Sequence, residues 1–323
     1  MINYPLKFTP ILKEKIWGGT KLKDLLNKKS HSDNIGESWE ISGVPDNISI
    51  VKNGSLAGKS LQELIHQYKA DLLGEIVFKK FGEEFPLLIK YIDAQTELSV
   101  QLHPNDKLAK ERHNSFGKTE MWYIMQADKD AEINVGFKRT ISKEEYLKHL
   151  EEGDIIDLLN FEKVKKGDSF FINTGKVHAI GAGVLLAEIQ QTSDITYRIY
   201  DWDRVDSKGI SRELHTGLAL EAIDFEKKDD FEISYDRNSN NSSNLARCEY
   251  FTTNFLPVKG KVEKDYSKVD SFVILMCVKG KVQIAIEDKM EKLQQGETIL
   301  IPASITKVKL LSENAHLLEV YIE

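Results

Sequence analysis

The chain has 323 residues, of which 41% are hydrophobic and 29% are charged, and its formal net charge is −7. This length suggests about two domains, and the apolar content is sufficient for packed cores. The acidic balance and the absence of a long basic block argue against nucleic acid or an anionic membrane as the main partner, although a pocket can still bind an anionic small molecule.

The sequence shows no pattern typical of secretion or membrane insertion. Its opening, MINYPLKFTPILKEKIWGG, lacks the apolar core of a signal peptide, and no stretch approaches the ~20 apolar residues of a membrane helix. The two cysteines, Cys248 and Cys277, lie far apart and lack metal-type spacing. We therefore expect a protein without disulfides in the cytoplasm.

Short apolar or alternating runs between turn residues predict β-strands along most of the chain. The runs in its first part are EISGVPDNISIVKNG, FPLLIKYIDA, LSVQLHP, EMWYIMQA, AEINVGF and DSFFINTG. Helical spacing of apolar residues predicts three helices, over 60–81, 142–159 and 211–223. The first two open with a Ser-x-x-Glu pattern that is typical of a capping box.

This mixture of many strands and few helices predicts an all-β sandwich or barrel with helical insertions. The Asn- and Ser-rich stretch 236–244 predicts an exposed linker or loop. We therefore expect an N-terminal domain over 1–235 and a smaller, strand-rich C-terminal domain over 245–323.

The two predicted domains share a weak repeat. KKGDSFFINTGKVHAI begins at Lys165, and QQGETILIPASITKVKL begins at Gln294. Each has a glycine, an acidic residue, an apolar strand and a turn, but only the first has a histidine after the turn, His178. Any metal bound through this unit should therefore lie in the first domain.

The stretch SVQLHPND places two polar side chains at the end of a predicted strand. Gln101 and His103 should project from the same face, because strand residues i and i+2 share a face, and Pro104 then ends the strand. Glu120 and His178 also lie in or beside predicted strands and could join them as metal ligands. Alone, each residue has an ordinary structural interpretation, such as a buried hydrogen-bonded histidine or an exposed strand glutamate.

Several motifs together resemble the type I mannose-6-phosphate isomerase family, in its short bacterial form. They are KIWGGTKL, IGESWEISG, SVQLHP, GKTEMWY, GKVHAIGAG and EIQQTSDITYRIYDWDR, and they occur in the family's order within residues 4–222. The spacing of Gly167, Gly175 and His178 also resembles the second cupin motif. The resemblance implies two cupin-type jelly-roll β-barrels, with no metal site in the second.

The resemblance also implies a ligand set and a catalytic group. One Zn²⁺ per chain would be bound by Gln101, His103, Glu120 and His178. Arg198 would be the catalytic arginine and Asp194 a nearby acid–base group, although four-residue spacing alone is equally typical of a surface ion pair.

Three further residues are candidate substrate contacts. Lys118 should share the strand face of Glu120, and the resemblance makes it a substrate or phosphate contact, with proton transfer as an alternative role. Ser99 matches a position near the phosphate, and Trp17 could form the floor of the pocket, although a tryptophan more often packs in a core.

The function implied by the resemblance is the reversible conversion of mannose 6-phosphate and fructose 6-phosphate through a cis-enediol. The expected partner is therefore a phosphorylated hexose, while the oligomeric state stays open. Two alternatives are a non-haem iron oxygenase, which also uses two histidines and one carboxylate, and a metal-bearing sugar-binding cupin without catalysis. Gln101 as a fourth ligand argues against the first, and the charged set Lys118, Asp194 and Arg198 argues against the second.

Overall fold

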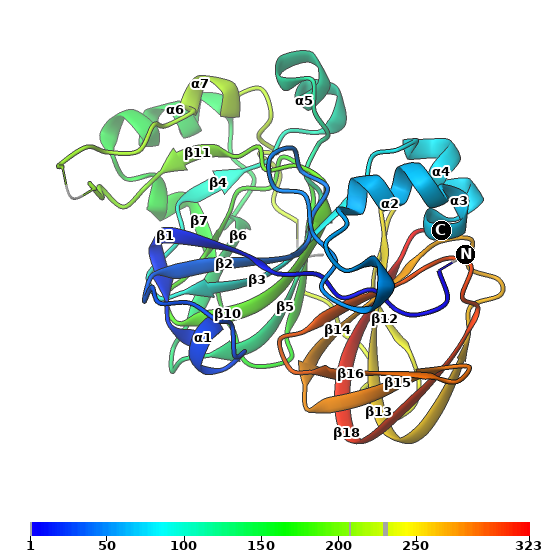
Figure 1. Ribbon diagram of the computed structural model, residues 1–323. Helices are drawn as coiled ribbons and strands as arrows, with labels where there is room; N and C mark the ends of the chain where they lie inside the picture. Colours follow the sequence, from blue (N-terminus) through cyan, green and yellow to red (C-terminus); the bar gives the residue numbers. More distant parts are fainter. Residues whose placement is uncertain (1, 207, 229–231) are drawn as a thin grey trace.

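The computed structural model describes residues 2–206, 208–228 and 232–323, and its dominant elements are β-strands (Figure 1). The strands before residue 201 are β1 (Ile11–Gly19), β2 (Ile35–Ile41), β3 (Leu87–Ala94), β4 (Val100–Leu102), β5 (Glu120–Ala127), β6 (Glu132–Phe137), β7 (Leu159–Lys163), β8 (Ser169–Ile172), β9 (His178–Ile180), β10 (Val184–Gln191) and β11 (Tyr197–Tyr200). Those after residue 242 are β12 (Ser243–Arg247), β13 (Thr252–Asp265), β14 (Val273–Lys279), β15 (Lys281–Ile286), β16 (Lys289–Gln294), β17 (Thr298–Ile301) and β18 (Lys307–Tyr321).

The first eleven strands form two antiparallel sheets that pack face to face. One has the order β1-β2-β3-β10-β5-β8, and the other has the order β11-β4-β9-β6-β7. Side chains from both sheets share one apolar cluster, in which Ile92 and Trp122 of the first sheet join Ile133 and Ile180 of the second. This sandwich carries the candidate site residues between its sheets.

The last seven strands form a third sheet, with the order β12-β13-β18-β14-β17 and the β15–β16 hairpin added to β18. The weak sequence repeat corresponds to equivalent turns in the two halves. Gly167, before β8, has φ 91°, and Gly296, before β17, has φ 82°, so both occupy a backbone region that favours glycine. When the two copies are aligned at Gly167 and Gly296, the position of His178 in the first copy corresponds to Lys307, at the start of β18, in the second.

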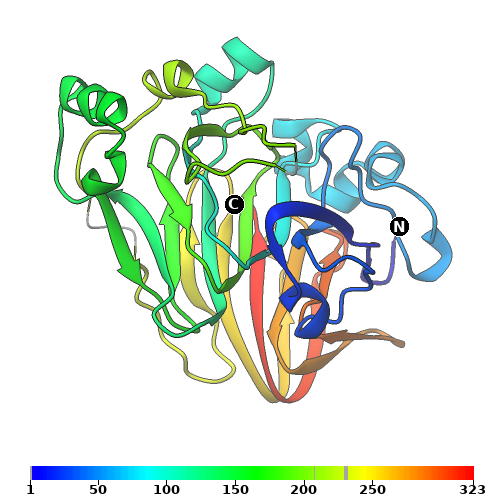
Figure 2. The ribbon, with the colours of Figure 1, turned by 90° about the vertical axis from the view of Figure 1, so that its left-hand side faces the viewer.

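The helices are short and mostly gather at one end of the strands (Figures 1 and 2). They are α1 (Lys21–Asp24), α2 (Leu61–Tyr68), α3 (Ala70–Leu73), α4 (Glu75–Phe81), α5 (Asp106–His113), α6 (Lys143–Glu152) and α7 (Thr216–Ala219), with 3₁₀ turns at Gly54–Leu56 and Ile155–Leu158. None of the helices in the described part of the chain has the length and apolar character needed to cross a membrane.

The expected single helix over 60–81 is wrong, because it is three helices. The capping box of Ser60 and Glu63 is present. The helix breaks at Lys69, with φ 45°, and again at Gly74, with φ 93°. A β-carbon at Gly74 would lie 2.3 Å from the carbonyl oxygen of Asp270. Close approach to a distant loop therefore interrupts this helix.

The other two helix predictions are too long. Helix α6 ends at Glu152, since Gly153 takes a left-handed conformation, and a 3₁₀ turn replaces its predicted end. The segment 211–223 contains only α7, because its first residues bond to the neighbouring strand β11 instead of forming helical turns. The Glu213 carbonyl accepts from Arg198 Nη1, and the His215 amide donates to the Arg198 carbonyl.

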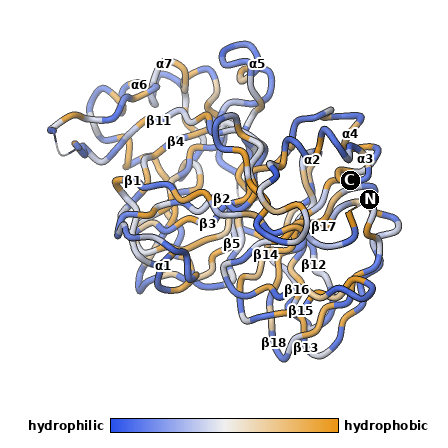
Figure 3. Tube along the Cα trace, viewed as in Figure 1, coloured by the Kyte–Doolittle hydropathy of each residue, from blue (hydrophilic) through white to orange (hydrophobic). Residues whose placement is uncertain are grey.

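One apolar core joins the two halves of the chain. It contains side chains from the N-terminal segment and from the third sheet, including Leu6, Phe272 and Leu300. Leu6 and Leu300 also exchange two backbone hydrogen bonds, of 2.7 and 2.9 Å. Figure 3 shows apolar residues concentrated along the strands and hydrophilic residues on many outer loops and helices. The division at 236–244 stays a proposal, and β12 begins within that stretch.

Candidate metal centre and active-site cavity

Sheet register brings three candidate residues together on one face of the second sheet. Arg198 of β11 lies opposite Gln101 of β4, and Gln101 lies opposite His178 of β9. Side chains of directly opposed residues project from the same face. His103 comes two residues after Gln101, just beyond the end of β4, and Pro104 follows it.

Two histidines and a glutamate converge between the sheets. His103 Nε2 lies 3.4 Å from Glu120 Oε2, and His178 Nε2 lies 3.6 Å from Glu120 Oε1. Potential ligand atoms of all three residues lie within 4.8 Å of one another. Within the described residues this is the one group of three or more His, Cys, Asp or Glu side chains with such geometry.

Both imidazoles are oriented by backbone carbonyl groups. His103 Nδ1 lies 2.8 Å from the Ile195 oxygen, and His178 Nδ1 lies 2.8 Å from the Lys176 oxygen. If Nδ1 donates in each pair, both Nε2 lone pairs face Glu120, which is the usual arrangement of metal-binding histidines. His178 Nε2 is buried and has no hydrogen-bond partner in the described chain. The two Nε2 atoms and the Glu120 carboxylate are therefore arranged as metal ligands would be.

Lys118 lies beside this group and is 4% exposed. Its Nζ is 2.9 Å from Glu120 Oε2 and 3.0 Å from His103 Nε2. Burial, together with the Lys118 charge, lowers the pKa of His103 to about 4. Burial also lowers the pKa of His178. Burial alone would raise the pKa of Glu120, but Lys118 and the histidines hold it well below its ordinary value.

A cavity of about 170 Å³ adjoins this centre. Its lining includes six residues proposed from the sequence: Trp17, Ser99, Gln101, Lys118, Asp194 and Arg198. Arg198 Nε donates to Ser99 Oγ at 3.3 Å, and Ser99 Oγ lies 3.3 Å from Gln101 Oε1. A polar chain therefore connects the arginine with the amide.

Asp194 and Arg198 do not form the ion pair that their spacing allows. Arg198 bonds instead to Ser99 and to the Glu213 carbonyl. The Asp194 carboxylate is exposed at the cavity and has no hydrogen-bond or ion-pair partner in the described part of the chain. Arg212, which sequence reasoning did not single out, also lines the cavity and pairs with Asp201.

Sequence reasoning also missed a row of polar residues across the first sheet. Trp39, Lys90, Glu188 and Trp122 are successive cross-strand partners on β2, β3, β10 and β5, and all four line the cavity. Lys90 Nζ lies 3.1 Å from Glu188 Oε1, and Trp122 Nε1 donates to Glu188 Oε2 at 3.0 Å. The available signal was a charged residue inside an apolar run, such as Lys90 in PLLIKYI.

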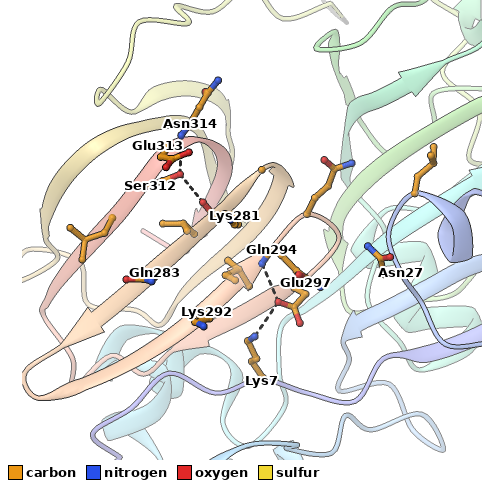
Figure 4. A pocket seen from close by; sticks show the side chains of 16 residues that line it. Lys7, Asn27, Lys281, Gln283, Lys292, Gln294, Glu297, Ser312, Glu313 and Asn314 are labelled. Carbon is orange, nitrogen blue, oxygen red and sulfur yellow. Dashed lines mark hydrogen bonds and ion pairs between the residues drawn. The ribbon is translucent and has the colours of Figure 1, made fainter.

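A larger cavity, of about 1090 Å³, lies in the C-terminal half between the β15–β16 hairpin and residues near the N-terminus. Its lining includes Lys7, Asn27, Lys281 and Glu297, and an ion pair of 3.1 Å joins Lys7 to Glu297 (Figure 4). None of the predicted site residues lines it. The buried metal-type group and the smaller cavity beside it are therefore the stronger candidate site.

Comparisons with known proteins show which family the chain resembles. The Phosphomannose isomerase type I catalytic domain matches residues 6–149, and the Mannose-6-phosphate isomerase cupin domain matches residues 241–322. Mannose-6-phosphate isomerase ManA of Bacillus subtilis is 36% identical over 313 residues, which cover 96% of this chain and 96% of that protein. The chain belongs to the type I phosphomannose isomerase family. The predicted family is thereby confirmed, and the chain is an aldose–ketose isomerase.

Other members of the type I phosphomannose isomerase family support the same assignment. The mannose-6-phosphate isomerase of Streptococcus mutans is 33% identical over 302 residues, covering 93% of each chain. The crystal structure of mannose 6-phosphate isomerase from Bacillus subtilis matches with a TM-score of 0.89 and 35% identity, over 98% of this chain and 99% of that one. The predicted cupin-type all-β fold with helical insertions is confirmed.

Proposed function

We propose that this chain interconverts mannose 6-phosphate and fructose 6-phosphate reversibly through a cis-enediol, with one Zn²⁺ bound per chain. The observation that carries the proposal is the convergence of His103, Glu120 and His178 beside a cavity lined by Lys118 and Arg198. Relatives that cover almost the whole chain carry the name mannose-6-phosphate isomerase, and this supports the same substrate here.

Four residues would hold the zinc ion. His103, His178 and Glu120 provide two nitrogens and a carboxylate, and the Gln101 amide oxygen would complete a four-ligand protein site. Gln101 is the weakest member because its oxygen is neutral. When bound, the ion would polarise or orient oxygen atoms of the sugar.

Arg198 would stabilise the negative charge that develops on the enediolate oxygens. Its guanidinium is held by Ser99 and by the Glu213 carbonyl, so it is already oriented before substrate binds. Fixed donors that face a developing charge are among the strongest sources of catalysis. Arginine suits this role since it stays protonated throughout the reaction.

Asp194 would carry the proton between C2 and C1. The other carboxylates that line the cavity are already engaged, because Glu37 accepts from Trp39 at 2.7 Å and Glu188 pairs with Lys90. Asp194 has no such partner in the described chain, so its carboxylate is free to accept and return a proton.

Lys118, Ser99 and Trp17 would bind the substrate. Lys118 offers an ammonium group to a sugar or phosphate oxygen, while Ser99 would hold the phosphate through its hydroxyl. Trp17 is 4% exposed and would form an apolar floor. We also propose that the N-terminal half alone contains the metal site, and that the protein works in a reducing compartment such as the cytoplasm, since Cys248 and Cys277 are free thiols.

A coupled assay of fructose 6-phosphate formation tests the proposal. Zinc-loaded protein should convert mannose 6-phosphate without oxygen or an organic cofactor, lose activity when a chelator removes the metal, and recover when zinc is restored. Oxygen consumption without ketose would instead favour an oxygenase. Tight sugar-phosphate binding without turnover would favour a binding protein.

A further inference from the structure

A tyrosine of the C-terminal half forms a hydrogen bond to α5, the helix that follows the His103 segment of the candidate metal centre. Tyr250 lies in the turn between β12 and β13, and its hydroxyl donates to Asp106 Oδ2 at 2.6 Å. The neighbouring Phe251 is buried, and the centroid of its ring lies 6.4 Å from the ring centroid of Phe171 on β8. The turn is therefore anchored against the first half of the chain, at the start of α5.

Asp106 joins two of the three segments that provide the proposed metal ligands, the segment of Gln101 and His103 and the segment of Glu120. It follows His103 by three residues, and its Oδ1 accepts from the Gly117 amide at 2.7 Å, three residues before Glu120. The approach is close, because a β-carbon at Gly117 would lie 2.7 Å from the Asp106 nitrogen. This carboxylate thus fixes the end of one ligand-bearing segment against the start of the other.

Gln191 extends this connection to the residue between Lys118 and Glu120. Its Nε2 donates to Asp106 Oδ1 at 3.0 Å, and its Oε1 accepts from the Thr119 amide at 2.8 Å. Gln191 also donates its own amide to the Thr119 carbonyl at 3.1 Å. The backbone on both sides of Lys118 is therefore held by Asp106 and Gln191.

We infer that Tyr250 and Asp106 are positioning residues for the metal centre, through which the C-terminal half sets the geometry of His103, Lys118 and Glu120. This inference rests on the proposed metal site. Tyr250 fixes the orientation of the Asp106 carboxylate, and Asp106 fixes the spacing of the ligand segments. Hydrogen bonds made directly to metal ligands typically change metal affinity by about 10- to 100-fold, and the bond between Tyr250 and Asp106, which lies one layer further out, should act at the lower end of that range.

Zinc affinity of the full-length protein, measured by competition with a chromophoric chelator, tests the inference without using activity. Tyr250→Phe keeps the ring and removes the hydroxyl, and we expect about tenfold weaker zinc binding. Asp106→Ala should weaken binding more. Asp106→Asn should stay within about threefold of the parent protein, because its amide oxygen can still accept from Gly117 and its nitrogen can donate to Tyr250.

Tyr266→Phe is the matched control. The Tyr266 hydroxyl donates to the Glu319 carboxylate at 2.7 Å, within the C-terminal half. Its loss removes the same type of hydrogen bond, so it should lower the melting temperature without changing zinc affinity. Tyr250→Phe should have no further effect in the Asp106→Ala background, because the tyrosine acts only through that carboxylate.

Unchanged zinc affinity in Tyr250→Phe would overturn the inference, and so would an equal loss in Tyr266→Phe or a parent protein that takes up no zinc. If Asp106→Ala does not fold, the zinc affinities of Tyr250→Phe, Asp106→Asn and Tyr266→Phe still test the positioning role of Tyr250. A zinc-loaded parent protein that forms no ketose would overturn the proposed function alone, since the zinc affinities do not depend on catalysis.

Discussion

Arg198 lies directly opposite Gln101 across the β11–β4 ladder, so the guanidinium and the amide project from the same sheet face. Ser99 Oγ lies 3.3 Å from both Arg198 Nε and Gln101 Oε1. Strand register therefore places the group proposed to stabilise the enediolate beside a group proposed to hold zinc. The two proposed roles are separable by mutation, because only Gln101 is a proposed metal ligand.

Loss of a ligand histidine should remove both metal and activity. We expect His103→Ala or His178→Ala to retain little zinc after dialysis and almost no isomerase activity, as measured by elemental analysis and the coupled assay. Gln101→Ala should lose less, because the neutral amide is the weakest ligand. His31→Ala, at an exposed position, is the control. Stoichiometric zinc in both histidine variants would contradict the proposed ligand set.

Arg198→Ala should separate chemistry from metal binding. We expect kcat to fall by about two orders of magnitude or more, the size of one lost oxyanion contact, while zinc content stays at one per chain. Arg139→Ala is the control, because Arg139 is an exposed arginine that pairs with Glu145. A variant with normal kcat and a raised KM would show that Arg198 binds substrate and does not stabilise the transition state.

Lys118→Ala should mainly raise KM for the phosphosugar if the ammonium holds a substrate oxygen equally in the ground and transition states. Steady-state kinetics at saturating zinc tests this. Zinc content must be measured in the same samples, because Lys118 Nζ lies 2.9 Å from Glu120. Equal losses in kcat and kcat/KM would instead assign Lys118 to the chemical step.

Substitutions of the buried pair Lys90 and Glu188 should have strongly coupled effects on the free energy of unfolding. Burial opposes the charge of Lys90, but Glu188 and Glu37 raise its pKa above the ordinary value. Lys90→Met leaves the buried Glu188 without its cation, so urea unfolding should show a loss of about 3–5 kcal/mol. Adding Glu188→Gln should recover part of this loss. Additive losses in the double variant would argue against direct coupling.

His316 should contribute to acid sensitivity. Partial burial, with nearby cations, lowers its pKa from 6.5 to about 4. A lowered histidine pKa means that the folded state favours the neutral ring. The resulting stability is present above pH 6.5 and is lost as the pH falls towards 4. Melting temperatures between pH 7.5 and 4.5 should fall less in His316→Gln than in the parent or in His31→Gln. Parallel curves for all three would contradict this.

The sequence predicted the strands and the family better than the helix boundaries. Alternating runs and motif order identify the sheets, because both are local patterns. The breaks at Lys69 and Gly74 depend on contact with Asp270, which lies far away in the chain and is invisible to local periodicity.

The site residues that belong to recognisable sequence motifs were predictable. The residues that meet only because two strands pair in a particular register were not. Gln101 and His103 share a strand end, so their common face follows from spacing. Lys90 and Glu188 meet only because β3 pairs with β10 in one register. Tyr250 reaches Asp106 from a turn in the other half of the chain, and no sequence pattern indicates that contact.

The most direct test of the central claim is an NMR experiment on mannose 6-phosphate with the zinc-loaded protein in D₂O. Proton transfer through an enediol exposes the migrating hydrogen to a protein base that exchanges with solvent. We predict fructose 6-phosphate with deuterium at C1, formed without oxygen and abolished by a chelator. A folded, zinc-loaded protein that forms no ketose would contradict the account.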